Sequence, residues 1–379
     1  MALTKVINDL IDLNATDATK SLKMPTGAAY SGTADPGMVR NSSETGSQGS
    51  ANVMQHFNGT DWKNYENKAN FNYTTDFLAV GGGGASGSNE GGGGGGGGLL
   101  TSVSTDTNGG SLNTRESTLT LTQATAYTIT IGNGGTKGNV NTASSPGDST
   151  TISGTGITAN GGGFGGTGEN TVPLYPGGAG ASGGGGSRGG ASVIPGGTAT
   201  NSGNQGFSGG ASSTNSDSSG GGGGASEVGV SRPSNLSGGA NGGDGRISTI
   251  ITTAIATSQS VGEVVGTDVY FSGGGGGGGF TGAVVGAGGD GGGKPGTQDD
   301  FAADGSPNTG GSGGGGAGSG GSDPSYTERI GGAGGSGVVI LKIFTSTLGT
   351  ISGTSNTSVS LGGGYTAVIF KESGTYTTP

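Results

Sequence analysis

A run of eight consecutive glycines, Gly91–Gly98, constrains this chain more than any other feature. Glycine has no side chain to bury and loses more backbone freedom on ordering than any other residue. An ordered run can form the extended left-handed helix with three residues per turn, which has no internal hydrogen bonds. Because glycine keeps its N–H group, such helices can hydrogen-bond to neighbours on every side. The pattern predicts a lattice of polyglycine II helices, with turns between the runs. Further runs are Gly81–Gly84, Gly183–Gly186, Gly220–Gly224, Gly273–Gly279 and Gly313–Gly316.

The composition supports the same interpretation. Glycine supplies 98 of 379 residues, whereas hydrophobic residues make up 28% and charged residues 11%. The hydrophobic fraction is too low for an ordinary core, and such a composition is typical of low-complexity, disordered chains. A disordered linker is therefore one alternative, but aliphatic strand-like segments at both ends of the glycine-rich region count against it. Collagen is excluded, because the runs ignore its three-residue Gly-X-Y period.

Charge and cysteine content exclude several kinds of partner. The net charge is −10 and basic residues do not cluster, which predicts no nucleic-acid partner. No apolar run reaches the length of a membrane span, so we expect no membrane insertion. The absence of cysteine excludes disulfides and thiolate metal sites. The first residues lack a basic region followed by an apolar stretch, so we expect synthesis in the cytoplasm without a secretory signal.

Residues 1–20 are predicted to form a docking segment with a short helix. Val6, Ile7 and Leu10 fall on one face of that helix. So short a helix is marginal in water by itself and needs a partner surface. Packing against a second domain of the same chain and docking onto another protein both remain open.

Residues 21–76 are predicted to form a small β module. Trp62, Phe57 and Met38 would be its core, and Asn58-Gly59 its hairpin turn. The module resembles a β module common in phage tail-fibre and virion proteins, although the aromatic residue of that pattern is missing between Arg40 and Asn41. The resemblance lies in the blocks MPTG (24–27), DPGMVRN (35–41) and FNGTDW (57–62).

Residues 77–344 are predicted to be the polyglycine domain, and residues 345–379 a β hairpin that caps it. The aliphatic strand 77–80 runs directly into glycine, and the strand 338–344 closes the region. Two further segments, 119–131 and 247–255, alternate apolar and polar residues and are predicted strands. The expected fold class is thus mostly β and irregular: a sandwich of polyglycine II helices framed by short strands.

The glycine-rich block contains four segments in order: FLAVGGGG, YTITIGNGG, TISGTGITANGGG and GGAGGSGVVILKI. With these segments it resembles the glycine-rich domain of phage tail-fibre tip adhesins of the T-even kind. The resemblance implies a virion adhesin, located on a tail fibre or another external appendage. Its partners would be a host surface protein or neutral glycan and other virion proteins, with a homotrimer favoured over a single copy. Attachment to the particle would use Val6, Ile7, Leu10 and Trp62.

Aromatic residues in the segments between glycine runs are the candidate receptor contacts, because aromatic side chains dominate recognition hot spots. They could equally plug the ends of the glycine bundle. The candidates are Tyr175, Phe207, Phe301 and Tyr326.

Nothing in the sequence indicates an enzyme or a cofactor. The segment Gly288–Gly293 followed by Lys294 imitates a phosphate loop, but Pro295 occupies the position of the Mg²⁺-binding Ser or Thr. Asp244 and Asp290 lie among glycines without the spacing of calcium β-rolls, so calcium is only a weak alternative.

Two further classes of function compete with adhesion. A purely architectural fibre, capsid-decoration or filament protein would use the glycine lattice as a stiff stalk. An ice-binding protein should show regularly spaced Thr or Ala on one face, and no constant spacing of this kind is evident.

Overall fold

The computed structural model describes residues 39–42, 53–57, 62–64, 72–139, 142–168, 176–189, 192–200, 204–214, 217–233, 236–280, 282–298, 301–318 and 329–379. The chain divides into two compact units, Met1–Asn70 and Phe71–Pro379. Most of the regular structure in these residues is β-strand in antiparallel sheets, and one α-helix lies among them. The predicted helix in residues 1–20, with Val6, Ile7 and Leu10, lies outside the described residues.

The described residues of the first unit form a small antiparallel sheet. Its strands are β1 (Val39–Ser42), β2 (Val53–Phe57) and β3 (Trp62–Asn64), paired in the order β1-β2-β3. Phe57 lies opposite Trp62 in the register of β2 and β3. Three short strands thus occupy the region where the sequence predicts a β module. The structure describes the backbone of Trp62 but not its side chain.

The second unit begins with a layered base. Its central sheet has the order β17-β18-β15-β4-β5, with β6 pairing along the first half of β4. A second sheet has the order β16-β19-β7-β8-β9, and a third the order β12-β14-β13. The central strands are β4 (Asn72–Val80), β5 (Leu99–Thr101), β6 (Leu119–Thr122), β15 (Val338–Phe344), β17 (Thr357–Gly362) and β18 (Tyr365–Phe370). The others are β7 (Ala126–Thr130), β8 (Thr150–Ile152), β9 (Ile157–Ala159), β12 (Arg246–Ile247), β13 (Glu263–Val265), β14 (Asp268–Phe271), β16 (Thr350–Ile351) and β19 (Gly374–Thr377).

The central sheet is covered on both faces, which explains why its middle strands are apolar without alternation. Successive side chains of a strand point to opposite faces. Phe77 and Ala79 of β4 join the core shared with the second sheet, in which Ile129 and Tyr376 are buried. Leu78 and Val80 join the other core, which contains Phe271 of the third sheet. A strand buried on both faces has to be apolar at every position.

Two predicted strands are wrong. Residues 119–131 form two strands, β6 and β7, which are separated by a turn and belong to different sheets. Residues 247–255 alternate apolar and polar side chains, but only Arg246–Ile247 form a strand, and α2 (Thr253–Gln259) begins within the segment. Thr252 caps this helix, because its side chain accepts a hydrogen bond from the Ile255 N–H. Ile250 and Ile251 are neighbours in the sequence and are both buried in the same core. Successive side chains of a strand would point to opposite faces, so these two residues do not follow the predicted alternation.

The strands of the C-terminal hairpin region belong to the base. β18 pairs with β15 and β17, whereas β19 pairs with β7 and β16 in the other sheet. The turn between β17 and β18 contains Gly362, Gly363 and Gly364, all with positive φ. The last residues therefore close two of the three layers of the base. The short 3-10 helix Thr345–Thr347 follows β15.

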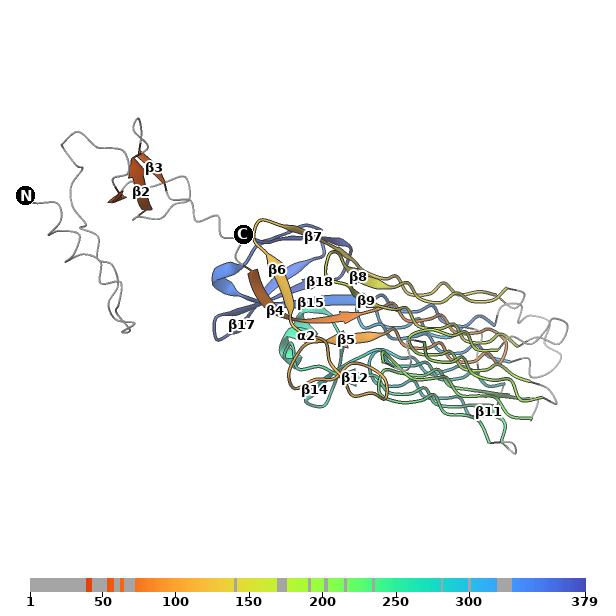
Figure 1. The fold of residues 1–379 in the computed structure, drawn as a ribbon. Helices are drawn as coiled ribbons and strands as arrows, with labels where there is room; N and C mark the ends of the chain where they lie inside the picture. Colours follow the sequence, from red (N-terminus) through yellow and green to blue (C-terminus); the bar gives the residue numbers. More distant parts are fainter. Residues whose placement is uncertain are drawn as a thin grey trace, which may run out of the picture. The chain divides into compact units, whose positions relative to one another are not determined.

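Beyond the base, extended glycine segments run side by side away from the strands (Figure 1). All six runs of four or more consecutive glycines are buried along their whole length, and we call the segments that contain them the inner segments. The remaining extended segments, which we call outer, expose some of their residues. A minimal two-residue parallel pair, β10 (Ser218–Ser219) with β11 (Gly238–Gly239), lies in this region.

Hydrogen bonds between these segments repeat every three residues. The N–H groups of Gly92, Gly95 and Gly98 donate to the carbonyls of Gly166, Gly163 and Asn160, at 2.9, 2.8 and 2.7 Å. The intervening Gly93 and Gly96 donate to Gly220 and Gly223, in a different segment. Carbonyls of the same run accept bonds from further segments, as in Gly84 N to Gly95 O, Gly275 N to Gly94 O and Gly185 N to Gly93 O. The run is therefore bonded to neighbours on several sides.

Buried serines interrupt the inner segments without loss of hydrogen bonds. The Ser86 hydroxyl donates to the Gly313 carbonyl and accepts from the Gly94 N–H at 2.7 Å. Ser219 Oγ donates to Gly278 O at 2.6 Å, and Ser312 Oγ donates to Gly94 O at 2.7 Å. A hydroxyl can thus replace a neighbouring backbone group, which a purely apolar side chain of that size cannot do.

Candidate interaction surface

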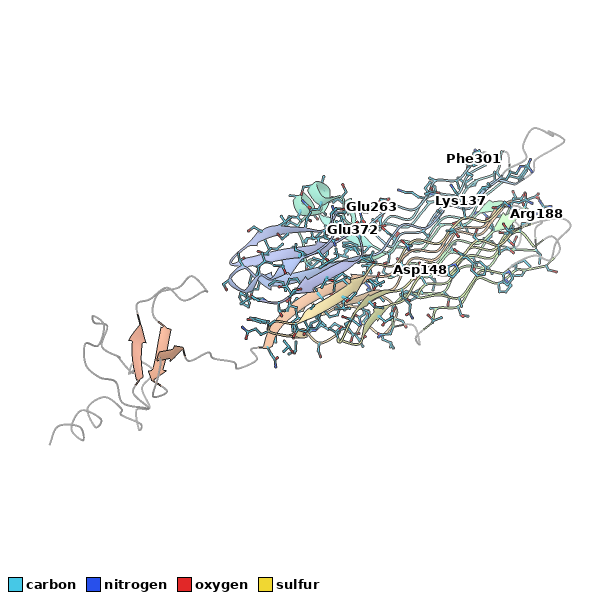
Figure 2. All side chains as sticks on the ribbon, turned by 90° about the horizontal axis from the view of Figure 1, so that it is seen from above. Lys137, Asp148, Arg188, Glu263, Phe301 and Glu372 are labelled. Carbon is cyan, nitrogen blue, oxygen red and sulfur yellow. The ribbon has the colours of Figure 1, made fainter. Side chains whose placement is uncertain are left out.

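The glycine segments give the second unit two distinct ends. Strands β4 and β5 lie at the base, and the two inner segments that follow β4 and precede β5 form a hairpin that pairs Gly81 with Gly98, Gly84 with Gly95 and Gly87 with Gly92. The hairpin turns at Ser88–Glu90, which therefore lie at the end remote from the base, the far end. Figure 2 shows Phe301 and Arg188 toward this end, whereas Glu263 and Glu372 lie at the base.

Large apolar side chains are exposed at the far end. Phe301 is 61% exposed, and its backbone forms a parallel bridge with Ile330. Val284 is 66% exposed and follows a turn in which Ala283 N donates to Phe280 O. Phe280 in turn forms a parallel bridge with Gly318. Side chains of this size are usually buried, but others are exposed at the base, among them Phe344 at 50%, so the far end is one of two candidate contact surfaces.

The structure separates the predicted receptor contacts. Phe301 lies at the far end, but Phe207 is only half-exposed and lies near the base, since its N–H donates to Gly224 O, one residue before the buried Ala225 of the core. Tyr175 and Tyr326 lie outside the described residues. Phe207 and Phe301 therefore cannot contribute to one contact area.

A charged pair lies beneath the far end. Glu90 is buried, and its Oε1 accepts a hydrogen bond from Arg188 Nη1 at 3.2 Å. Burial raises the pKa of the Glu90 carboxyl to about 7, against the opposing effect of Arg188. No sequence motif marks this residue. Its signal was a single acidic residue placed directly before the longest run of glycine.

Other acidic side chains gather at the base and are engaged in structural hydrogen bonds. Glu263 Oε2 accepts from the N–H groups of Gly291 and Gly292, at 2.6 and 2.7 Å. Asp244 Oδ1 accepts from Asp290 N at 2.9 Å. Neighbouring carboxylates contribute to the raised pKa of Asp290, in which burial is the larger cause. The described residues hold no group of three or more side chains of the kinds that bind a metal ion.

The described part of the chain offers little to a small ligand. Two shallow hollows lie at the base. One, of about 310 Å³, is lined by Glu116, Leu119 and Thr155 among others, and the other, of about 210 Å³, by Ile251, Lys342, Leu361 and Tyr365 among others. Tyr365 stacks on Phe344 at 4.4 Å between ring centroids, and Lys342 Nζ lies 4.8 Å from the centre of the Tyr365 ring. The imitation of a phosphate loop is part of the hydrogen-bonded lattice, where Lys294 N donates to Ser312 O. No helix in the described residues is long and apolar enough to span a membrane.

The outer segments carry a sequence signal that the glycine runs conceal. In several of them exposed residues recur at every third position, and glycine or another small residue fills most of the positions between. A search for a three-residue period outside the glycine runs would have found these surfaces. Examples are Asn133, Thr136 and Asn139; Pro195 and Thr198; Val284 and Ala287; Pro295 and Gln298; and Phe301, Asp304 and Pro307.

Residues 60–344 match the model of a family described as a glycine-rich domain. This range covers the inner and outer segments and most strands of the base. The chain belongs to the glycine-rich domain family. No curated protein and no solved structure matches it. The family membership accounts for the composition and for the region that forms the glycine segments, and it leaves the partner open.

Proposed function

We propose that this glycine-rich domain protein is a phage virion adhesin that binds a host receptor through the far end of a polyglycine II scaffold. The observation that supports it best is the structural difference between the two ends of the second unit. Layered sheets and two apolar cores lie at the base, whereas the far end consists of turns between glycine segments, in which Phe301 and Val284 are exposed. Rigid scaffolds that present variable turns are a common way to build binding surfaces.

The polyglycine II part of the proposal rests on the three-residue repeat. Hydrogen bonds from one glycine segment to a given neighbour recur every third residue, and exposed side chains of several outer segments recur at the same interval. A left-handed helix with three residues per turn has this period, and its N–H groups point outward in three directions. At a rise of ~3.1 Å per residue, the run Gly91–Gly98 would extend roughly 25 Å.

The scaffold itself cannot supply specificity. Glycine presents only backbone groups, which do not distinguish one receptor from another. Side chains at the far end must therefore select the partner. The sequence resemblance to tail-fibre tip adhesins favours a host surface protein or a neutral glycan, and the net charge of −10 disfavours an anionic surface.

The test compares two matched pairs of exposed apolar residues in the full-length chain. Phe301→Ser with Val284→Ser changes the far end, and Val264→Ser with Val265→Ser changes exposed residues of β13 at the base. Fluorescently labelled protein is bound to host cells, and competition with adsorption of the particle is measured. We expect the far-end pair to lose tenfold or more in affinity, as for hot-spot truncations of about 1.4 kcal/mol, and the base pair to bind normally.

The architectural alternative makes the opposite prediction. If the wild-type protein does not bind host cells, or if neither pair changes binding, the far end is not the receptor surface. Labelling the intact particle with an antibody against the far end then decides between the two functions. A stalk protein would have this end covered by another virion protein, whereas an adhesin would have it free.

A further inference from the structure

The turn Ser88–Glu90 joins the ends of several segments at the centre of the far end. Glu90 N donates to Ala317 O at 3.0 Å, and Glu90 O accepts from Arg188 N at 3.1 Å. Asn89 N donates to Arg329 O at 3.0 Å, and Ser88 O accepts from Gly168 N at 3.1 Å. In sequence, Gly168 and Arg329 are the described residues next to positions 169–175 and 319–328, and Ala317 and Arg188 each lie one residue further from positions 319–328 and 190–191. One turn therefore holds four segment ends together.

The same turn contains unfavourable features that the contacts have to overcome. Asn89 and Glu90 both have φ of +54°, in the left-handed region that side chains rarely adopt. The Glu90 side chain is 1% exposed, and its Oε2 has no hydrogen-bond partner among the described residues. Asn89 Oδ1 is a second buried acceptor without a partner in the described part of the chain. A buried carboxylate oxygen without a donor is costly when it is charged.

A proton changes this balance. Protonation removes the buried charge and turns one of the two acceptors into a donor. The closed turn then keeps its backbone hydrogen bonds without burying a charge. When the carboxyl is ionised, the charge can gain full hydration only if the turn opens. Packing against Gly318 leaves no room for movement inside the closed turn, because a Cβ at that glycine would overlap the Glu90 carboxyl.

We propose that Glu90 is a proton-operated latch of the far end: the turn stays closed on the surrounding segments while the carboxyl is protonated, and opens to water when it ionises. The charged groups that act on it are Arg188 and Arg329, which favour the ionised form, and Asp217, which opposes it. The desolvation of Glu90 outweighs the two arginines. If the far end is the receptor surface, as in the proposed function, the latch would make adsorption depend on pH.

Thermodynamic linkage between proton binding and opening of the turn gives the size and sign of the pH dependence. The closed turn holds the pKa of Glu90 at about 7, and an open turn returns it to 4.5. The closed form therefore binds the proton more tightly, and closure loses stability as pH rises from 4.5 to 7. The equilibrium constant for opening should increase roughly 70-fold between pH 5 and pH 8.

Amide hydrogen exchange of the full-length chain measures this opening directly, after correction for the intrinsic pH dependence of exchange. Peptides covering residues 84–92 and 183–189 report on the turn, and a peptide covering β15 reports on the base. In wild type we expect the tip peptides to open more with rising pH, levelling off above pH 7, while the base peptide stays constant. Glu90→Gln should remain closed at every pH.

The control is Glu116→Gln, which removes a carboxylate that accepts from Asn108 Nδ2 at 2.9 Å near the base. It should keep the wild-type pH response at the tip. The latch is refuted if the wild-type tip shows no pH response, or if Glu90→Gln keeps it. Should Glu90→Gln fail to fold, the wild-type pH curve alone decides. Because exchange is read without a receptor, a failure of the latch is distinguishable from a failure of the adhesin proposal, which cell binding tests.

Discussion

Substitution of Gly276 tests whether the glycine lattice is as tightly packed as the structure indicates. Gly276 lies in the middle of an inner segment, where its N–H donates to Lys294 O and its carbonyl accepts from Gly315 N, both at 2.9 Å. A Cβ at this position would lie closer than 3.0 Å to Gly286 O, Gly286 C and Ala287 O. These are backbone atoms of another segment, so no side chain can rotate away.

The cost follows from the geometry. Forcing the segments apart resembles overpacking of a core, at about 1–3 kcal/mol. The displacement also stretches the two hydrogen bonds of Gly276, each worth about 1 kcal/mol net and more if a buried group loses its partner. Gly276→Ala should therefore cost about 3–5 kcal/mol, a large part of a typical stability of about 5–15 kcal/mol. Gly276→Val, with two further methyl groups, should prevent soluble folding.

Thermal unfolding followed by circular dichroism gives the readout. At about 2–4 °C per kcal/mol, Gly276→Ala should lower Tm by at least about 6 °C. Gly282→Asn is the matched control, because no atom lies within 4 Å of a Cβ there and asparagine tolerates its φ of +86°. A Gly276→Val protein with normal Tm would refute the packed lattice, since it would mean that the segments separate at no cost.

Two further substitutions probe single groups. Ser86→Ala leaves the buried Gly94 N–H without its acceptor and should cost about 1–3 kcal/mol in chemical denaturation, whereas Ala at the exposed Ser117 should be neutral. Asp106→Asn should lower stability by about 2 kcal/mol, because the buried carboxylate accepts from Ser248 Oγ, Thr249 N and Thr249 Oγ1 at 2.7, 3.0 and 2.8 Å. Asn at the exposed Asp148 is its control, and equal effects of the two would contradict this assignment.

The runs of consecutive glycine were the most informative part of the sequence. They correspond to the six buried inner segments, because only a residue without a Cβ can have another backbone on every side. The framing strands around Phe77–Val80 and Val338–Phe344 were also predictable, since both faces of these strands are buried. By contrast, the helix at Thr253–Gln259 was not, because a short polar helix packed by one alanine leaves almost no periodic signal.

The candidate site was harder to predict than the scaffold. Which turns share one end depends on how many times the chain reverses between them, and low-complexity sequence does not mark each reversal. Phe207 and Phe301 both lie between glycine runs, yet one is near the base and the other at the far end. Glu90 could not be recognised either, because its importance arises from Arg188 and Gly318, 98 and 228 positions further along the chain.

The three-residue repeat also governs how the length of such a protein can change. Removing three residues from an outer segment shortens it by one repeat and leaves Phe301, Asp304 and Pro307 facing outward in the same order. Removing one or two residues turns every remaining side chain by a third or two thirds of a revolution, so that an outward residue is driven into the neighbouring backbone. Natural length variants should therefore differ by multiples of three within the segments, and by any number in the turns.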